Sequence, residues 1–162
     1  MELDSGRRVV FGREGAPSAT PAEAVRASCA IPAYFEPPLI DGQRFVDGGV
    51  HSTTNADLVA DEAPDLVLIS APMSAARGAS PRFGPRVAIR QIARLSLSRE
   101  VAGLRGRDIP VIAFEPTAAD LAVMGGDSLD PAKLSPVCAQ VFESTCQRLS
   151  RSDVRERLTA LV

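Results

Sequence analysis

The sequence has few aromatic residues and almost no lysine. Trp is absent, Tyr34 is the only tyrosine, and Lys133 is the only lysine among 18 basic residues. Binding of single-stranded nucleic acid usually relies on stacked aromatic rings along a basic groove, whereas the net charge here is −2. The composition therefore argues against a nucleic-acid partner.

Long hydrophobic runs are also missing. No stretch approaches the roughly 20 apolar residues that a membrane-spanning helix needs, and residues 1–20 lack the apolar centre of a secretory signal. The three cysteines, Cys29, Cys138 and Cys146, do not have metal-ligand spacing, and their odd number favours free thiols in a reducing compartment. We therefore expect a cytoplasmic protein that at most touches a membrane peripherally.

The elements that are present predict one α/β domain over residues 1–162. Thr20-Pro21-Ala22-Glu23 is a capping box that opens a helix, and the apolar runs at 66–69 and 109–114 are typical of buried parallel strands. The remaining predicted elements are an edge strand at 9–11, strands at 39–40 and 44–46 around an Asp41-Gly42 turn, and helices at 21–30, 53–60 (capped by Thr53 or Thr54), 85–104, 131–149 and 152–161.

The predicted sheet is unusually small. With only two or three buried strands it would expose an apolar edge and give each helix little surface to cover. The sequence therefore indicates either a piece of a larger domain or a sheet that is completed from elsewhere.

The run Val46-Asp47-Gly48-Gly49 is the main candidate site. An aspartate at the end of a strand followed by two glycines suits a tight turn with close backbone approach, and ligands of α/β sheets gather at such positions. Taken alone, the tripeptide favours an ordinary strand-ending turn, because Asp and Gly are common turn residues.

The flanking residues distinguish these interpretations, because their order and spacing resemble the second half of the patatin-like phospholipase family. The matching positions, within a resemblance over about residues 8–150, are Ser28, Pro32, Phe35, Pro37, Asp41-Gly42, Asp47-Gly48-Gly49 and Asn55. The resemblance implies a three-layer α/β/α fold, present here as its C-terminal half. It also implies that Asp47 is the base of a serine–aspartate dyad that hydrolyses lipid esters.

The other parts of that dyad site are not in the sequence. In the family, a serine in a Gly-x-Ser-x-Gly turn attacks the ester, and a Gly-rich loop stabilises the oxyanion; neither motif occurs between Met1 and Val162. We therefore expect a lipid acyl hydrolase fragment that supplies Asp47 and is inactive alone. The alternatives are a non-catalytic remnant or binding module, and a subunit that pairs with a separate N-terminal half.

Other candidate residues fit catalysis less well. Gly126-Asp127-Ser128-Leu129 spells an esterase signature, but it lies near the C-terminus with no histidine after it, so a helix-capping turn is favoured. Ser80 lacks a strand–turn–helix context. His51 is the only histidine, and a lone histidine in a loop is more typical of a solvent-facing residue than of a catalytic one. We expect no cofactor and no metal, because Asp41, Asp47 and His51 lack clear ligand geometry.

An arginine stripe recurs along the predicted long helix. Its members are Arg82, Arg86, Arg90 and Arg94. Residues four apart share one helix face, so the stripe predicts a solvated face or, alternatively, a cationic strip for anionic lipid head groups.

Overall fold

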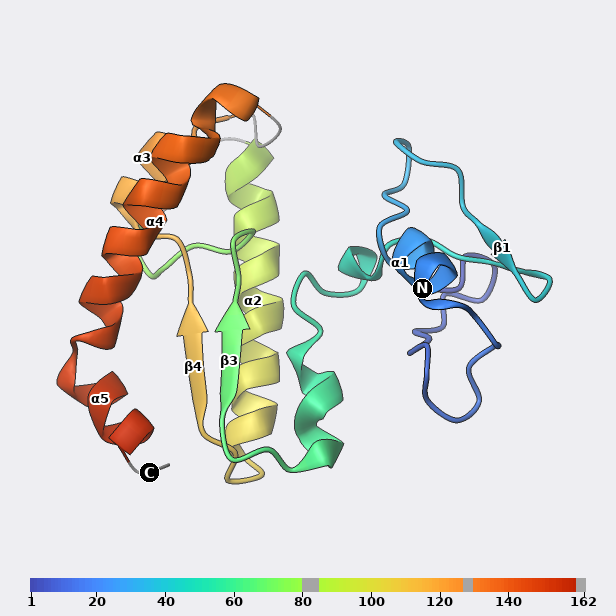
Figure 1. Ribbon diagram of the computed structural model, residues 1–162, viewed down its shortest axis with the longest axis horizontal. Helices are drawn as coiled ribbons and strands as arrows, with labels where there is room; N and C mark the ends of the chain where they lie inside the picture. Colours follow the sequence, from blue (N-terminus) through green and yellow to red (C-terminus); the bar gives the residue numbers. More distant parts are fainter. Residues whose placement is uncertain (80–84, 127–129, 160–162) are drawn as a thin grey trace. The chain divides into compact units, whose positions relative to one another are not determined.

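The computed structural model describes residues 1–79, 85–126 and 130–159 (Figure 1). Contacts within the chain divide it into two compact units, Met1–Asn55 and Ala56–Val162. We call them the N-terminal and C-terminal units, and each is described by itself. Among the described residues, no helix is both long and apolar enough to cross a membrane.

The N-terminal unit begins its regular structure with the predicted helix. Helix α1 spans Pro21–Ser28. The Thr20 hydroxyl accepts a hydrogen bond from the Glu23 amide at 3.3 Å, and the Glu23 carboxylate accepts one from the Thr20 amide at 2.8 Å. These bonds satisfy amides that have no partner inside the helix. The helix is confirmed, although it ends at Ser28 rather than Ala30.

A short hairpin follows. Strands β1, Leu39–Ile40, and β2, Gln43–Arg44, pair antiparallel. The turn residues have φ angles of +50° at Asp41 and +74° at Gly42, the left-handed conformation that a two-residue hairpin turn requires. The predicted hairpin is therefore confirmed, with a second strand shorter than expected.

The core of this unit explains one wrong prediction. Residues 9–11 form no strand. Phe11 instead packs its ring against Phe45, with 5.1 Å between the ring centroids, and Phe45 is completely buried. The apolar run therefore serves ring packing rather than strand pairing. The residues that share this core are Val9, Phe11, Ala19, Ala27, Ile40 and Phe45.

The hairpin is followed by 3₁₀ helix η1 (Gly48–Val50) in the N-terminal unit, and the C-terminal unit begins with 3₁₀ helix η2 (Ala56–Glu62). The prediction of a threonine-capped helix at 53–60 is wrong in its start. The helix begins at Ala56, whose amide donates to the Glu100 carboxylate at 3.0 Å. A residue distant in sequence thus supplies the cap.

The centre of the C-terminal unit is a parallel β-α-β arrangement. It consists of strand β3 (Val67–Ser70), helix α2 (Pro85–Arg105) and strand β4 (Val111–Phe114). The two buried strands and the long helix are therefore confirmed. Their shared core includes Ile69, Ala71, Leu97, Leu104, Ile109 and Val111.

Helix α3, Ala118–Met124, is an element that the sequence analysis missed. The Thr117 hydroxyl accepts from the Asp120 amide at 3.3 Å, and the Asp120 carboxylate accepts from the Thr117 amide at 2.7 Å. This is a capping box with aspartate in place of the usual glutamate. The Thr-x-x-Asp spacing was the signal that could have identified it.

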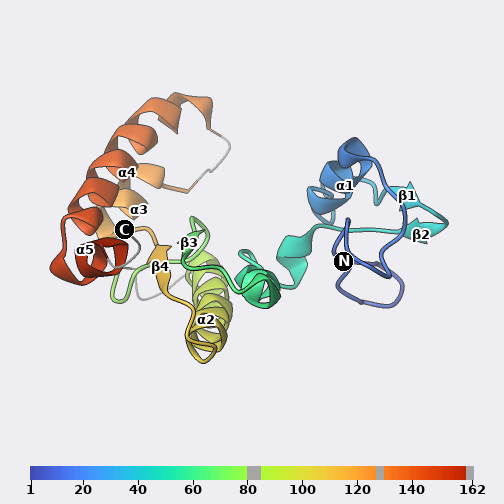
Figure 2. The same ribbon diagram turned by 60° about the horizontal axis from the view of Figure 1, so that its bottom comes forward.

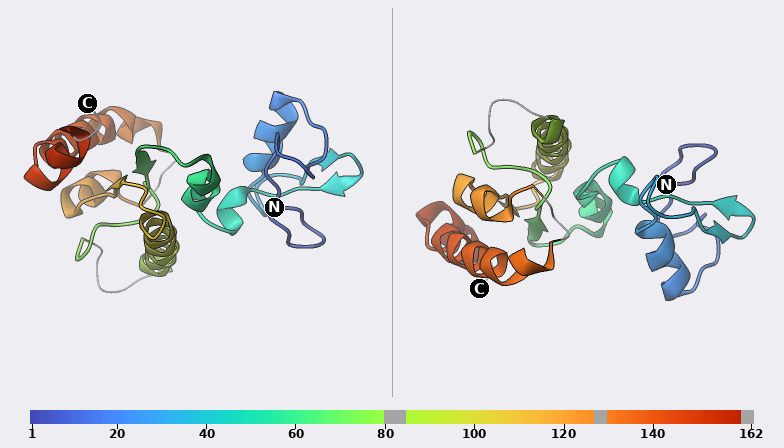
Figure 3. Two further views of the ribbon diagram at one scale, coloured as in Figure 1. Left: turned by 90° about the horizontal axis from the view of Figure 1, so that it is seen from below. Right: turned by 90° about the horizontal axis from the view of Figure 1, so that it is seen from above.

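The last described segments are helical, with η3 (Pro131–Lys133), α4 (Leu134–Leu149) and α5 (Ser152–Thr159). The expected cap at Asp130 is confirmed, because its carboxylate accepts from the Ala132 amide at 3.0 Å. Within the C-terminal unit, α2 lies on one side of the two strands and α3 and α4 on the other (Figures 2 and 3). This layering agrees with an α/β fold.

Candidate active site

Asp47 follows a buried stretch of chain in the N-terminal unit. Phe45 is fully buried and Val46 is 6% exposed. The Val46 amide donates to the Met1 carbonyl at 2.8 Å, and the Asp47 amide donates to the Ala30 carbonyl at 2.9 Å. The backbone before and at Asp47 is therefore fixed by contacts to two distant segments.

The Asp47 carboxylate uses one oxygen in its own turn and leaves the other open. The residue is half-buried, and Oδ1 accepts a hydrogen bond from the Gly49 amide at 2.6 Å. Asp47 thereby caps helix η1. Within the described residues, Oδ2 has no hydrogen-bond partner. A carboxylate held by one oxygen keeps its orientation while the other oxygen can accept a proton.

The two glycines of the motif have different roles. A Cβ atom at Gly49 would lie 2.9 Å from Oδ1 of Asp47, closer than real Cβ contacts come. A Cβ atom at Gly48 would lie 3.6 Å from Nδ2 of Asn55, which is ordinary contact. The close approach of the carboxylate therefore requires glycine at position 49.

Asn55 closes the loop that begins at Asp47. Its Nδ2 donates to the Gly48 carbonyl at 3.3 Å and to the Ser52 carbonyl at 2.5 Å. Arg8 in turn donates to Oδ1 of Asn55 at 3.2 Å. The φ of Asn55 is +47°, a left-handed conformation that asparagine tolerates better than most residues. Asn55 thus has a positioning role, and Arg8 is a residue that sequence reasoning missed.

The negative charge of Asp47 acts on the amino group of Met1. This group donates to the Val46 carbonyl at 2.8 Å. Burial lowers the pKa of the amino group, and the negative charge of Asp47 opposes that decrease.

Large apolar side chains are exposed on two segments near Asp47. One follows the motif in the chain, and the other follows Ala30, whose carbonyl accepts the hydrogen bond from the Asp47 amide. Tyr34 is 76% exposed and Phe35 is 61% exposed. Ile31, directly after Ala30, and Val50, in η1, are exposed as well.

The alternative catalytic candidates lie elsewhere or outside the description. Ser80 and Ser128 fall outside the described residues. His51 is exposed, and its backbone amide donates to the Gly48 carbonyl at 3.0 Å. Asp41 occupies the exposed hairpin turn.

The arginine stripe is partly engaged within the protein. Arg82 and the side chain of Arg86 lie outside the described part. Arg90 donates to the Pro72 carbonyl at 2.9 Å and to the Ser74 carbonyl at 2.7 Å. This guanidinium therefore anchors the loop that follows β3.

A serine–carboxylate pair, not foreseen from the sequence, lies at the carboxyl ends of β3 and β4. The Ser74 hydroxyl is 2.9 Å from Oε1 of Glu115 and 3.1 Å from the Ala71 carbonyl. Ser74 is completely buried, so its hydroxyl is inaccessible to an ester. The pair joins the loops after the two strands and is structural in character.

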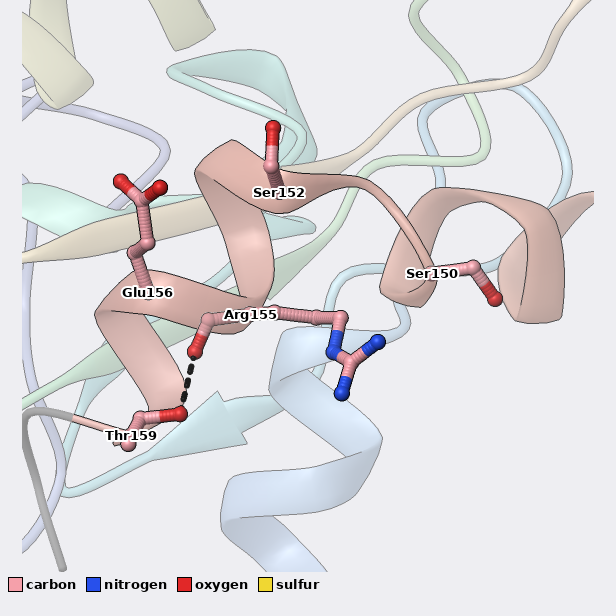
Figure 4. Close-up of a pocket in the computed structure, with 5 residues that line it drawn as sticks. All are labelled: Ser150, Ser152, Arg155, Glu156 and Thr159. Atoms are coloured by element: carbon pink, nitrogen blue, oxygen red, sulfur yellow. Dashed lines mark hydrogen bonds between the residues drawn. The ribbon is translucent and has the colours of Figure 1, made fainter.

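A shallow hollow beside α5 contains none of the motif residues. Figure 4 shows its lining, Ser150, Ser152, Arg155, Glu156 and Thr159, with the Thr159 hydroxyl donating to the Arg155 carbonyl at 2.9 Å. Across residues 1–79, 85–126 and 130–159, no three acidic, histidine or cysteine side chains gather as metal ligands would.

Comparison with known proteins bears on the N-terminal part of the chain. The model of the patatin-like phospholipase family matches residues 1–60, a shorter stretch than the resemblance suggested. The match contains Asp47-Gly48-Gly49 and Asn55, and it confirms the family resemblance for this part of the chain. No solved structure matches the chain.

Proposed function

We propose that this chain, whose residues 1–60 match the patatin-like phospholipases, supplies the catalytic aspartate of a serine lipid acyl hydrolase. Asp47 is the base, and the nucleophilic serine belongs to a polypeptide outside the printed sequence. One observation carries the proposal: Oδ1 of Asp47 is held by the Gly49 amide at 2.6 Å while Oδ2 is open.

The chemistry needs a single carboxylate in two steps. Oδ2 of Asp47 removes the proton from the serine hydroxyl as its oxygen attacks the ester carbonyl carbon. The tetrahedral intermediate collapses, the ester C–O bond breaks, and the protonated Asp47 returns its proton to the leaving alcohol. Water then attacks the acyl-serine with Asp47 again as base, which releases the fatty acid and restores the serine.

An acyl lipid is the favoured substrate class. The family match supports it, and so do the exposed Ile31, Tyr34 and Phe35 near the Asp47 backbone contact. An acyl chain that covers such side chains removes apolar surface from water, at about 25 cal/mol per Å².

The test is a reconstitution. The Gly-x-Ser-x-Gly-bearing region of a full-length patatin-like phospholipase is prepared as a separate polypeptide, here called the serine polypeptide. We expect no p-nitrophenyl butyrate hydrolysis by the chain alone and turnover on mixing. Asp47→Asn should abolish that turnover, whereas Asp41→Asn, the same change in the exposed hairpin turn, should leave it unchanged.

Two results would contradict the proposal. Turnover of the mixture that is equal for wild type and Asp47→Asn would exclude Asp47 as the base. Turnover by the isolated chain that disappears with Asp47→Asn would show that the nucleophile lies within the printed sequence.

A further inference from the structure

The first residues of the N-terminal unit pair with the stretch of chain that leads into Asp47. Glu2 forms an antiparallel bridge with Phe45, and the Val46 amide donates to the Met1 carbonyl at 2.8 Å. Phe45 is completely buried, so this stretch is anchored in the core of the unit. The pairing therefore gives the first residues a fixed place beside the approach to Asp47.

A closed turn brings the chain back to this pairing. The Glu2 amide donates to the Arg7 carbonyl at 2.9 Å, and the Gly6 amide donates to the Glu2 carbonyl at 3.0 Å. Gly6 has a φ of +68°, a left-handed conformation that glycine adopts without strain. Because the Arg7 backbone is bonded to Glu2, the next residue, Arg8, leaves the turn from a fixed position.

Arg8 reaches the far end of the loop that begins at Asp47. Its guanidinium donates to Oδ1 of Asn55 at 3.2 Å in a half-buried site, and Nδ2 of Asn55 donates to the Gly48 carbonyl at 3.3 Å. A guanidinium has donors and no acceptor. The contact therefore selects the orientation of the Asn55 amide in which Oδ1 faces Arg8 and Nδ2 faces the Gly48 carbonyl.

We propose that Arg8 is a positioning residue for Asp47 that acts through the Asn55 side chain, a step that rests on the proposed function of Asp47. Without Arg8, the Asn55 amide is free to rotate. Rotation would place an acceptor opposite the Gly48 carbonyl and break the hydrogen bond between them. The turn that directs the Asp47 carboxylate then loses its support, although Asp47 itself is still present.

The amide proton of Gly49 reports this positioning in the isolated full chain. A short hydrogen bond to a carboxylate moves an amide proton resonance downfield, and the Gly49 nitrogen lies 2.6 Å from Oδ1 of Asp47. Arg8→Ala should move the resonance upfield, toward its position in Asp47→Asn. Arg7→Ala is the matched control and should leave it in place, because the exposed Arg7 side chain pairs with Glu2 at 3.2 Å and surface ion pairs contribute little. A resonance that Arg8→Ala leaves unmoved would overturn the proposal, whatever Asp47 does in catalysis.

Acylation kinetics with the serine polypeptide measure the consequence for catalysis. Arg8→Ala should lower the rate constant of the p-nitrophenol burst by about tenfold or more, because a small displacement of a catalytic group is costly, and should leave the burst amplitude near that of wild type. Arg8→Lys keeps a cationic donor and should lose less; it decides the question if the alanine variant does not fold. A reduced amplitude with an unchanged rate constant would mean that Arg8 only stabilises the fold, and would overturn the proposal.

A double substitution shows whether Arg8 acts through Asn55. In an Asn55→Ala chain, adding Arg8→Ala should change neither the Gly49 resonance nor the burst rate constant any further, because the contact is already absent. A second loss that adds to the first would overturn the proposal. Conversely, if Arg8→Ala moves the Gly49 resonance while Asp47→Asn retains full turnover, the function of Asp47 as base is wrong and the positioning of its carboxylate stands.

Discussion

The Gly49 amide donates a hydrogen bond to Oδ1 of Asp47 at 2.6 Å, so a glycine two residues away sets the direction of the proposed base. Asn55 supports this loop, because its Nδ2 donates to the Gly48 and Ser52 carbonyls. The orientation of the Asp47 carboxylate is therefore a property of the loop from 47 to 55.

Gly49→Ala should displace the Asp47 carboxylate, because the new Cβ would lie 2.9 Å from Oδ1. We expect a loss of about 1 kcal/mol in unfolding free energy from the broken hydrogen bond, and at least about a tenfold loss of reconstituted turnover from the displaced base. Urea denaturation and ester hydrolysis measure the two effects. Gly48→Ala is the control, and equal effects from both substitutions would contradict the assigned geometry.

Asn55→Ala should destabilise the chain by about 1–3 kcal/mol, because the side-chain hydrogen bonds to the Gly48 and Ser52 carbonyls and to the Arg8 guanidinium are lost. The left-handed φ of +47° adds a backbone cost to alanine. Asn55→Gly removes that backbone cost but not the loss of hydrogen bonds. Urea denaturation should find that the glycine variant is destabilised too. If the Asn55→Gly variant were as stable as wild type, backbone strain alone would account for the effect of alanine.

Glu100→Ala should loosen the start of η2, because the Glu100 carboxylate accepts the Ala56 amide in a buried site. An unsatisfied buried amide costs about 1–3 kcal/mol. Amide exchange at Ala56 should accelerate, whereas Glu100→Gln, which keeps an acceptor oxygen, should show a smaller change. Glu156→Ala, on the exposed side of α5, serves as the control. Unchanged Ala56 protection in the alanine variant would refute the cap.

The lowered pKa of Asp120 predicts that the stability of the folded protein depends on pH. Burial raises the pKa of this carboxyl. Hydrogen bonds from Thr117, Ser144 and Gln140 together lower the pKa by more than burial raises it, so the pKa lies below the ordinary 3.8. A depressed folded-state pKa gives stability that is present above the unfolded pKa and is lost as pH falls through the folded value.

Unfolding midpoints measured from about pH 6 down to about pH 2 should therefore fall with acid. Asp120→Asn should lower stability at neutral pH and flatten the acid decline. Asp41→Asn makes the same chemical change at an exposed turn and provides the comparison. An acid decline as steep in Asp120→Asn as in Asp41→Asn would argue against this contribution.

Local signals in the sequence predicted much of the fold. The Thr20–Glu23 capping box, the Asp41-Gly42 turn and the apolar strands are each encoded by neighbouring residues. The misses have non-local or weaker causes. The start of η2 depends on Glu100, 44 positions from Ala56, and the run 9–11 is placed by Phe45. Helix α3 is short, and its cap has aspartate where glutamate is usual.

The residues of the candidate site likewise fall into those that local sequence could predict and those that depend on distant contacts. Asp47, Gly48 and Gly49 could be singled out because the motif and its flanks lie within one stretch of sequence. Arg8 could not, since it reaches Asn55 across 47 positions. The Ser74–Glu115 contact likewise spans 41 positions and has no motif at either end.

The acylation rate in a single turnover tests Asp47 as the base most directly. With the serine polypeptide at saturating concentration, the p-nitrophenol burst reports the step in which the serine proton is removed. We predict that Asp47→Asn lowers the burst rate constant by about 10²–10⁴, the usual contribution of a general base, while the affinity between the two polypeptides is unchanged. A burst rate constant equal to that of Asp41→Asn would contradict the assignment.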